Sequence, residues 1–146
     1  MSVTNDYLSP SEILLYQLRT DNANNAYARG LAYNNYQQSM LDNSHNAALN
    51  DMRRQWSQNF LRTQGGFAHR NLGESGIYHQ GLQNWAMNRQ SAFGNLNRGY
   101  QGSSNGLGYQ RQSLADTRDA SINQTGLDRQ ARQDEYAAAL RAAQGA

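Results

Sequence analysis

The sequence predicts an all-α, elongated protein whose helical segments pack in an oligomer. Val occurs once and Ile three times in 146 residues, so a β sheet would lack its usual filling. Apolar residues recur instead at spacings of three and four over long stretches with a single proline. Only 38% of the residues are hydrophobic and the mean hydropathy is −0.91. So little apolar material makes a poor internal core, and we expect burial between subunits.

The first helix has a clear start signal at Ser9-Pro10-Ser11-Glu12. Ser9 can cap the helix, Pro10 suits its first position, and Glu12 stands where the carboxylate of a capping box reaches back. Residues 1–9 therefore form an N-terminal tail. Residues 1–8 show no basic region followed by an apolar run, so we expect no signal peptide.

Residues 10–66 predict one long helix, which Gly65-Gly66 should end. The amide-rich run at residues 21–25 and the lone Gly30 leave open whether the helix is continuous or breaks there. The apolar positions do not follow a strict heptad, and an eleven-residue or mixed repeat fits equally well. These positions are Tyr27, Leu31, Tyr33, Tyr36, Met40, Leu41, Ala48, Met52, Trp56 and Phe60.

Residues 67–108 are predicted to form a Gly-rich helical segment and a loop. Ten of the 13 glycines lie in this segment or at its edge. Helical periodicity is kept from Ser75, the expected N-cap, to about Tyr100. The run Gly102-Ser103-Ser104-Asn105-Gly106 is typical of a loop between helices.

Residues 109–146 predict a C-terminal helix. Apolar positions recur sparsely along it, and the Ala-rich end strongly favours a helix. Asp128 and Arg132 stand four residues apart and are expected to form an ion pair on its surface. With the two preceding segments, this helix makes one structural unit.

The composition excludes several kinds of active site. The chain has no Cys and all 13 of its basic residues are Arg, so thiolate sites and a phosphate-loop lysine are absent. His69, Glu74 and His79 are spaced by five residues and do not share a helix face, which argues against a metal site. Ser75 lacks the second glycine of a nucleophile elbow, because Ile77 stands in its place. We expect no cofactor, no metal and no enzymatic activity.

The charge pattern argues against nucleic acid as a direct partner. The net charge is only +2, and the arginines are scattered among acidic residues. Binding to phosphates normally needs a clustered basic face. No run approaches 18 apolar residues either, so we expect no membrane span.

Aromatic side chains are the most promising candidates for contacts. Nine Tyr and two Trp accompany 17 Asn and 16 Gln in a very polar chain. Tyr and Trp bury a large area and keep a polar group, which suits subunit interfaces. The predicted interface residues are Tyr33, Tyr36, Met52, Trp56, Phe60, Ile77, Tyr78, Leu82, Trp85 and Phe93.

One segment resembles a known group of proteins. Residues 70–82 read Arg-Asn-Leu-Gly-Glu-Ser-Gly-Ile-Tyr-His-Gln-Gly-Leu. This run is similar to one in small helical virion proteins of tailed bacteriophages, where Arg-x-Leu-x-x-Ser-Gly-Ile/Leu-Tyr precedes a polar helix. The resemblance covers about residues 67–100 and includes no catalytic residue. It implies a structural role in the particle, in the tail, tail tip or connector.

The leading hypothesis is therefore a structural component of a bacteriophage virion, assembled in the host cytoplasm. It would act through helix-mediated assembly with itself and with neighbouring virion proteins. The alternative is an internal virion protein that is ejected with the genome and contacts DNA or membrane. Salt-sensitive DNA binding, or a gain of helix on anionic lipid, would distinguish the alternative.

Overall fold

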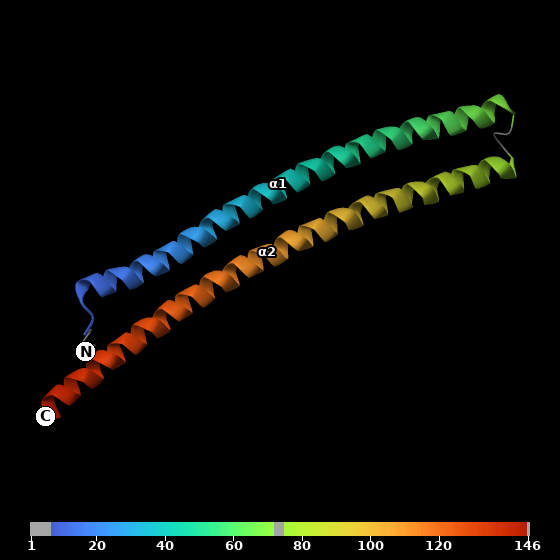
Figure 1. The fold of residues 1–146 in the computed structure, drawn as a ribbon. Helices are drawn as coiled ribbons and strands as arrows, with labels where there is room; N and C mark the ends of the chain where they lie inside the picture. Colours follow the sequence, from blue (N-terminus) through green and yellow to red (C-terminus); the bar gives the residue numbers. More distant parts are fainter. Residues whose placement is uncertain (1–6, 72–74, 146) are drawn as a thin grey trace, which may run out of the picture. The chain divides into compact units, whose positions relative to one another are not determined.

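The computed structural model describes residues 7–71 and 75–145, and these residues form two helices (Figure 1). Helix α1 spans Pro10–His69 and helix α2 spans Gly76–Gly145. The described residues contain no strand, which confirms the all-α class. The expected boundary between a Gly-rich segment and a separate C-terminal helix, at residues 108 and 109, lies inside α2.

The start of α1 is the capping box that the sequence predicts. The Ser9 hydroxyl accepts a hydrogen bond from the Glu12 backbone N–H at 3.3 Å, and the Glu12 carboxylate accepts one from the Ser9 backbone N–H at 3.0 Å. The two contacts pair backbone donors that the first helical turn leaves unsatisfied. Pro10 is the first residue of the helix, where its missing N–H costs nothing.

Helix α1 is continuous through both positions that the sequence left open, the amide run at residues 21–25 and Gly30. It also continues through Gly65-Gly66, so the predicted stop there was wrong. Neither glycine has a positive φ, so the backbone at these positions does not require glycine. The helix ends at His69, and Asn71 then adopts a left-handed φ of 57°. Asn tolerates this conformation better than most residues, so the stop signal lies at Asn71.

Helix α2 begins at the N-cap that the sequence predicts. The Ser75 hydroxyl accepts a hydrogen bond from the Tyr78 backbone N–H at 3.2 Å. The predicted loop at residues 102–106 was wrong, because α2 runs through it without interruption. Half-buried Tyr100, Ser104 and Leu107 keep the spacing that faces α1. Tertiary packing of such a face commonly outweighs the poor helix propensity of glycine.

This placement predicts that the Gly102→Ala variant is more stable than the wild type. A Cβ at Gly102 meets no atom within 4 Å, and Ala in a helix interior is better than Gly by about 1 kcal/mol. Thermal unfolding followed by circular dichroism should show a higher Tm. Gly81→Ala is the matched control, because its Cβ would lie 2.8 Å from the Phe67 ring and should lower the Tm. A flexible loop at residues 102–106 would instead leave the Tm of Gly102→Ala unchanged.

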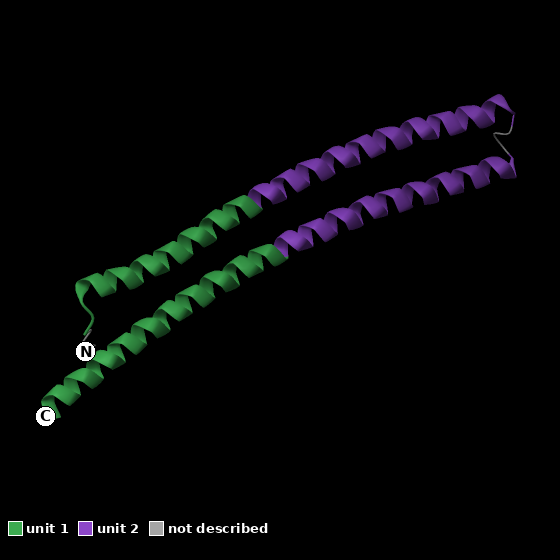
Figure 2. Cartoon of the chain, in the orientation of Figure 1, with its two compact units in different colours: residues 1–34, 109–146 green, residues 35–108 purple. Residues whose placement is uncertain are grey.

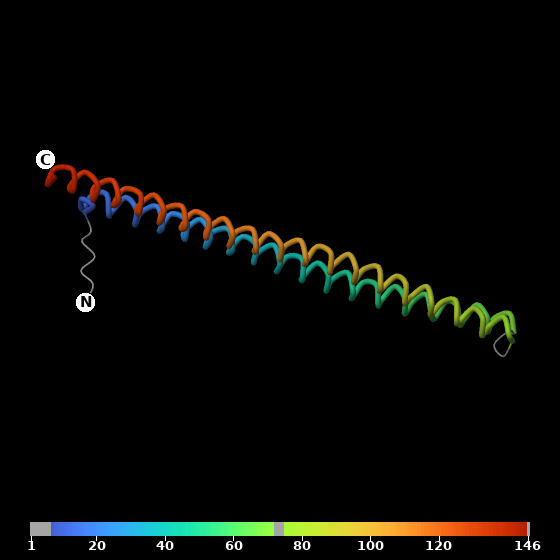
Figure 3. The backbone as a smooth tube through the Cα atoms, turned by 90° about the horizontal axis from the view of Figure 1, so that it is seen from below, coloured from blue at the N-terminus to red at the C-terminus, as the bar shows by residue number. Residues whose placement is uncertain are grey.

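The chain divides into two compact units, which are coloured separately in Figure 2. Unit 1 contains residues 1–34 and 109–146, and unit 2 contains residues 35–108. Each unit is a pair of antiparallel helical segments, one from α1 and one from α2. The paired segments of each unit lie side by side in the views of both Figure 1 and Figure 3.

Both helix pairs bury little. Leu8, with 6% of its surface exposed, and Asn34, with 2%, are the only described residues that solvent hardly reaches. The other side chains between the helices are half-buried, since two helices alone cannot enclose a residue on all sides. Gly30 and Gly81 allow close approach, because Leu114 and the Phe67 ring occupy the space that a Cβ would need.

Candidate functional site

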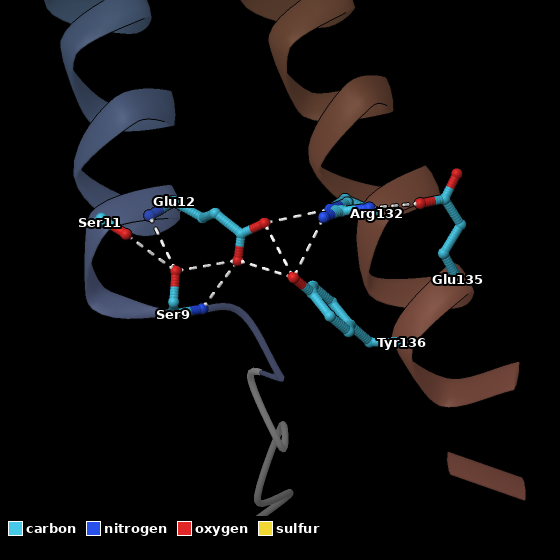
Figure 4. A network of polar contacts seen from close by, with 6 residues as sticks. All are labelled: Ser9, Ser11, Glu12, Arg132, Glu135 and Tyr136. Atoms are coloured by element: carbon cyan, nitrogen blue, oxygen red, sulfur yellow. Dashed lines mark hydrogen bonds and ion pairs between the residues drawn. The ribbon is translucent and has the colours of Figure 1, made fainter. Parts of the chain in front are cut away.

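A network of polar contacts joins the two helices in unit 1 (Figure 4). The Arg132 Nε donates to the Glu12 carboxylate at 3.0 Å, and the Tyr136 hydroxyl donates to the same carboxylate at 3.1 Å. Arg132 also pairs with Glu135 at 2.8 Å on its own helix. The predicted Asp128–Arg132 pair is not what the structure has. Asp128 accepts instead from Arg19 of α1, at 3.4 Å, because the facing helix offers partners that spacing along one helix does not reveal.

The network sets the charge state of Glu12. The backbone N–H of Ser9 and the Arg132 guanidinium hold the pKa of the Glu12 carboxyl at about 2, below its ordinary 4.5. Both partners stabilise the ionised form. The same contacts, above all those with Glu135 and Glu12, raise the pKa of Arg132.

The folded-state pKa of Glu12 therefore lies below its unfolded value, so its stabilising effect is complete above about pH 4.5 and lost towards pH 2. Amide hydrogen exchange at residues 9–13 is expected to become faster as the pH falls through this window, after correction for intrinsic rates. Glu12→Gln should remove the pH dependence at these amides. Equal pH dependence in the variant and the wild type would contradict the assignment.

The most buried polar layer also lies in unit 1. The Arg111 Nε donates to the Asn34 Oδ1 at 2.6 Å, and the Asn34 Nδ2 donates to the Gln110 Oε1 at 3.3 Å. Further along the same helix pair, the Arg118 guanidinium stacks over the Tyr27 ring at 4.3 Å. Planar guanidinium groups suit both kinds of contact. Arg and Asn side chains thus fill positions between these two helices that Leu commonly fills in an apolar helix pair.

Unit 2 has a polar layer and an aromatic layer. The Tyr100 hydroxyl donates to the Asp42 carboxylate at 2.7 Å, and the Tyr100 ring stacks on His45 at 4.2 Å. The hydrogen bond lowers the pKa of Asp42 and raises that of Tyr100. Further along, the Trp85 ring contacts Phe60 at 5.0 Å and Trp56 at 5.9 Å. This cluster is an apolar contact between the helices of unit 2.

The residues between the helices recur every eleven positions, which resolves the open question of the repeat. Three turns at 3.67 residues per turn bring the same face back after eleven residues. In α1 one half-buried or buried series is Glu12, Ala23, Asn34, His45, Trp56 and Phe67, and another is Tyr16, Tyr27, Gln38, Leu49 and Phe60. In α2 the half-buried series is Trp85, Leu96, Leu107, Arg118 and Arg129.

The contacting pairs show in which register the helices face each other. In unit 1 the contacting pairs Tyr27–Arg118 and Asn34–Arg111 have residue numbers that add up to 145. In unit 2 the same total holds for three pairs, which are His45–Tyr100, Phe60–Trp85 and Phe67–Tyr78. Each unit therefore has one antiparallel register, and side chains of the repeat meet in layers.

Seven of the ten predicted interface residues are half-buried, and among these Trp85 contacts Trp56 and Phe60 across the two helices. Tyr33, Tyr36 and Ile77 are exposed by 63%, 61% and 63%. The seven half-buried residues lie in unit 2, between α1 and α2 of the same chain: Met52, Trp56, Phe60, Tyr78, Leu82, Trp85 and Phe93. Sequence reasoning missed Glu12, Asn34, Arg111 and Arg132 as interface residues. Asn34 and Arg111 stand at multiples of eleven residues from aromatic positions such as Trp56 and Tyr78, and this spacing could have identified them.

The other candidate motifs give no site in the part of the chain that the structure describes. No three His, Asp or Glu side chains there come together as ligands for a metal ion, and Glu74 lies outside that part. Residues 102–108 are helical and cannot cradle a phosphate as a loop. Neither α1 nor α2 contains a described stretch that is long and apolar enough to cross a membrane.

Comparison with known proteins gives no relative. No family model, curated protein or solved structure matches the chain significantly.

Proposed function

We propose that this chain is a structural component of a bacteriophage virion that acts by helix-mediated assembly with itself and with neighbouring virion proteins. The observation that carries the assembly role is that both helix pairs enclose very little apolar surface. Apart from Leu8, no hydrophobic side chain of the described residues is enclosed. Chains with so little enclosed apolar surface gain stability from neighbours.

The exposed apolar residues support this role. In unit 1, Leu14 and Leu18 are exposed and stand four residues apart on one helix face. In unit 2, Tyr36 and Met40 are exposed with the same spacing. Each pair gives a second helix an apolar contact about one turn long. The surrounding Asn and Gln side chains are uncharged and allow many copies to pack without repulsion.

The placement in a phage particle rests on the resemblance of residues 70–82 to small virion proteins of tailed bacteriophages. The arginine contacts favour a structural role over the alternative of a protein that contacts DNA. Arg111, Arg118 and Arg132 are engaged with groups of their own chain. Arginines used in this way do not form the clustered basic face that phosphate binding needs.

Mass spectrometry of particles purified from cells that produce this chain tests the proposal. The chain should band with the particles in a density gradient, at a fixed copy number per particle after a high-salt wash. Recovery only in the soluble lysate fraction would contradict a structural role. Loss from particles after DNA ejection, with retention beforehand, would favour the ejected internal protein instead.

A further inference from the structure

The eleven-residue repeat does not change phase between α1 and α2. Phe67, near the end of α1, and Tyr78, near the start of α2, are eleven residues apart and belong to the same series. Beyond the exposed Arg89, the series continues with half-buried residues at 100, 111, 122 and 133. A turn between two helices does not require this continuity. A single helix through the connection would keep all interior residues on one face.

The register of the hairpin is compatible with the same arrangement between two chains. Facing residues of the repeat have numbers that add up to 145 in each unit, as for Asn34–Arg111 and His45–Tyr100, and the other contacts between the helices lie within a few residues of this register. Two antiparallel copies related by a twofold axis at the connection would follow the same rule, with residue i of one copy facing residue 145 − i of the other. Every contact inside one chain could then form between two chains, and each would occur twice.

We propose that two copies of this chain exchange helices, so that α1 of one copy packs on α2 of the other and the connection becomes helical. The occupant of the α1 face is then the α2 helix of a second, identical chain. This assignment specifies how the proposed self-assembly takes place. Only the biological purpose of the dimer rests on the proposed function. It also makes the interface prediction specific: Trp56, Phe60 and Trp85 become contacts between subunits.

Asn71 is the residue that opposes the exchange. Its φ of 57° belongs to the left-handed region, and its backbone N–H donates to the Ala68 carbonyl at 3.1 Å, which ends α1. A helical connection would return Asn71 to the ordinary right-handed region. Gly at position 71 favours the turned form, because it adopts positive φ without a steric cost. Ala favours the helical form, because it has the best helix propensity and a poor left-handed conformation.

Spin labels on single cysteines give a direct test, because the chain has no Cys of its own. Gln58 and Gln64 are exposed positions of α1. In the exchanged dimer, two labels at position 58 lie 29 residues apart along the dimer axis, or about 44 Å at 1.5 Å per residue. Two labels at position 64 lie 17 residues apart, or about 26 Å. A monomer contains one label and gives no dipolar distance.

The expected result is a dimer by light scattering whose label distance falls by about 18 Å between Gln58→Cys and Gln64→Cys. Asn71→Ala should lower the dimer dissociation constant at least tenfold relative to Asn71→Gly, since each dimer contains two connections. A dimer whose two distances do not differ in this way would overturn the proposal. So would an Asn71→Ala variant that stays monomeric up to millimolar concentration.

These outcomes are independent of the particle experiment. An exchanged dimer in a chain that does not band with particles would refute the virion role alone. A chain that bands with particles but never dimerises would refute the exchange alone.

Discussion

Trp85→Ala is expected to lower the free energy of unfolding by about 3 kcal/mol, the lower end of the range for truncating a large aromatic side chain. Trp85 is half-buried and contacts the Phe60 and Trp56 rings at 5.0 and 5.9 Å. The Arg89 guanidinium also lies 6.0 Å from its ring. Removing the indole therefore removes both its contacts with the aromatic rings of α1 and its contact with the Arg89 guanidinium on α2. Urea unfolding, followed by circular dichroism at 222 nm, measures the loss.

Trp85→Phe is the matched control. The indole Nε1 is buried without a hydrogen-bond partner among the described residues, so Phe sacrifices ring area but no polar contact. We expect Phe to retain more than half of the stabilisation that Ala loses. Equal losses for the two variants, or no loss for Ala, would show that the aromatic layer does not hold the helices together.

The same layer links stability to assembly. Replacing both Trp56 and Trp85 with Ala is expected to abolish self-association while the helices keep much of their circular dichroism signal. The reason is that the two substitutions remove the aromatic layer of unit 2 and leave the polar layers between the helices, whose packing still supports the helical conformation. Sedimentation velocity measures the association state of the variant against the wild type. Self-association that survives both substitutions would place the interface elsewhere, for example at exposed Leu14 and Leu18.

The sequence predicted best what depends on neighbouring residues. The capping box of Ser9 and Glu12 and the N-cap at Ser75 were both confirmed. Such caps involve contacts over three residues, which the sequence displays directly. The prediction of a loop at residues 102–106 was wrong because the helix there depends on contacts with residues that are distant in the sequence. Glycine lowers helix propensity locally, whereas packing of Tyr100 and Leu107 on α1 acts over a long range.

The pairing of the two helices was beyond the reach of local patterns. Spacing identified Trp56 and Phe60 as members of one face, and Trp85 as a member of another, but not that these faces meet. Tyr33 and Tyr36 were chosen as aromatic members of the apolar positions along the first helix. They fall outside the eleven-residue series, and the structure leaves them exposed. Polar members such as Asn34 were missed because an apolar stripe was the only criterion.

Replacing Asn34 with Ala should lower the free energy of unfolding by about 2 kcal/mol, because it leaves half-buried Arg111 and its neighbour Gln110 without their partner. Replacing both Asn34 and Arg111 with Leu should recover this loss, since a well-packed apolar pair commonly equals a buried polar one. We expect the double variant to lose the unique alignment of the two helices, because the polar layer also selects their register.

An eleven-residue repeat permits more than one antiparallel register. A shift of the helices by one repeat keeps interior positions opposite each other. In one direction it would move Arg111 from Asn34 to Ala23, which offers its guanidinium no acceptor. In the other direction it would place Asn34 opposite Ile122, which offers its amide no partner. The polar layer thus penalises the shifted register, as a single buried polar residue does in coiled coils. With Leu at both positions, this penalty disappears.

Spin labels at exposed Asn24 and Ser121, both within unit 1, measure the register. The wild type should give one short distance, because these residue numbers add up to 145. The double Leu variant should add a second population displaced by about 16 Å, the rise of eleven residues. Leu at exposed Asn25 and Gln112 is the matched control and should keep the single distance. A single distance in the double Leu variant would mean that the connection alone sets the register, and Asn34 would then contribute only to stability.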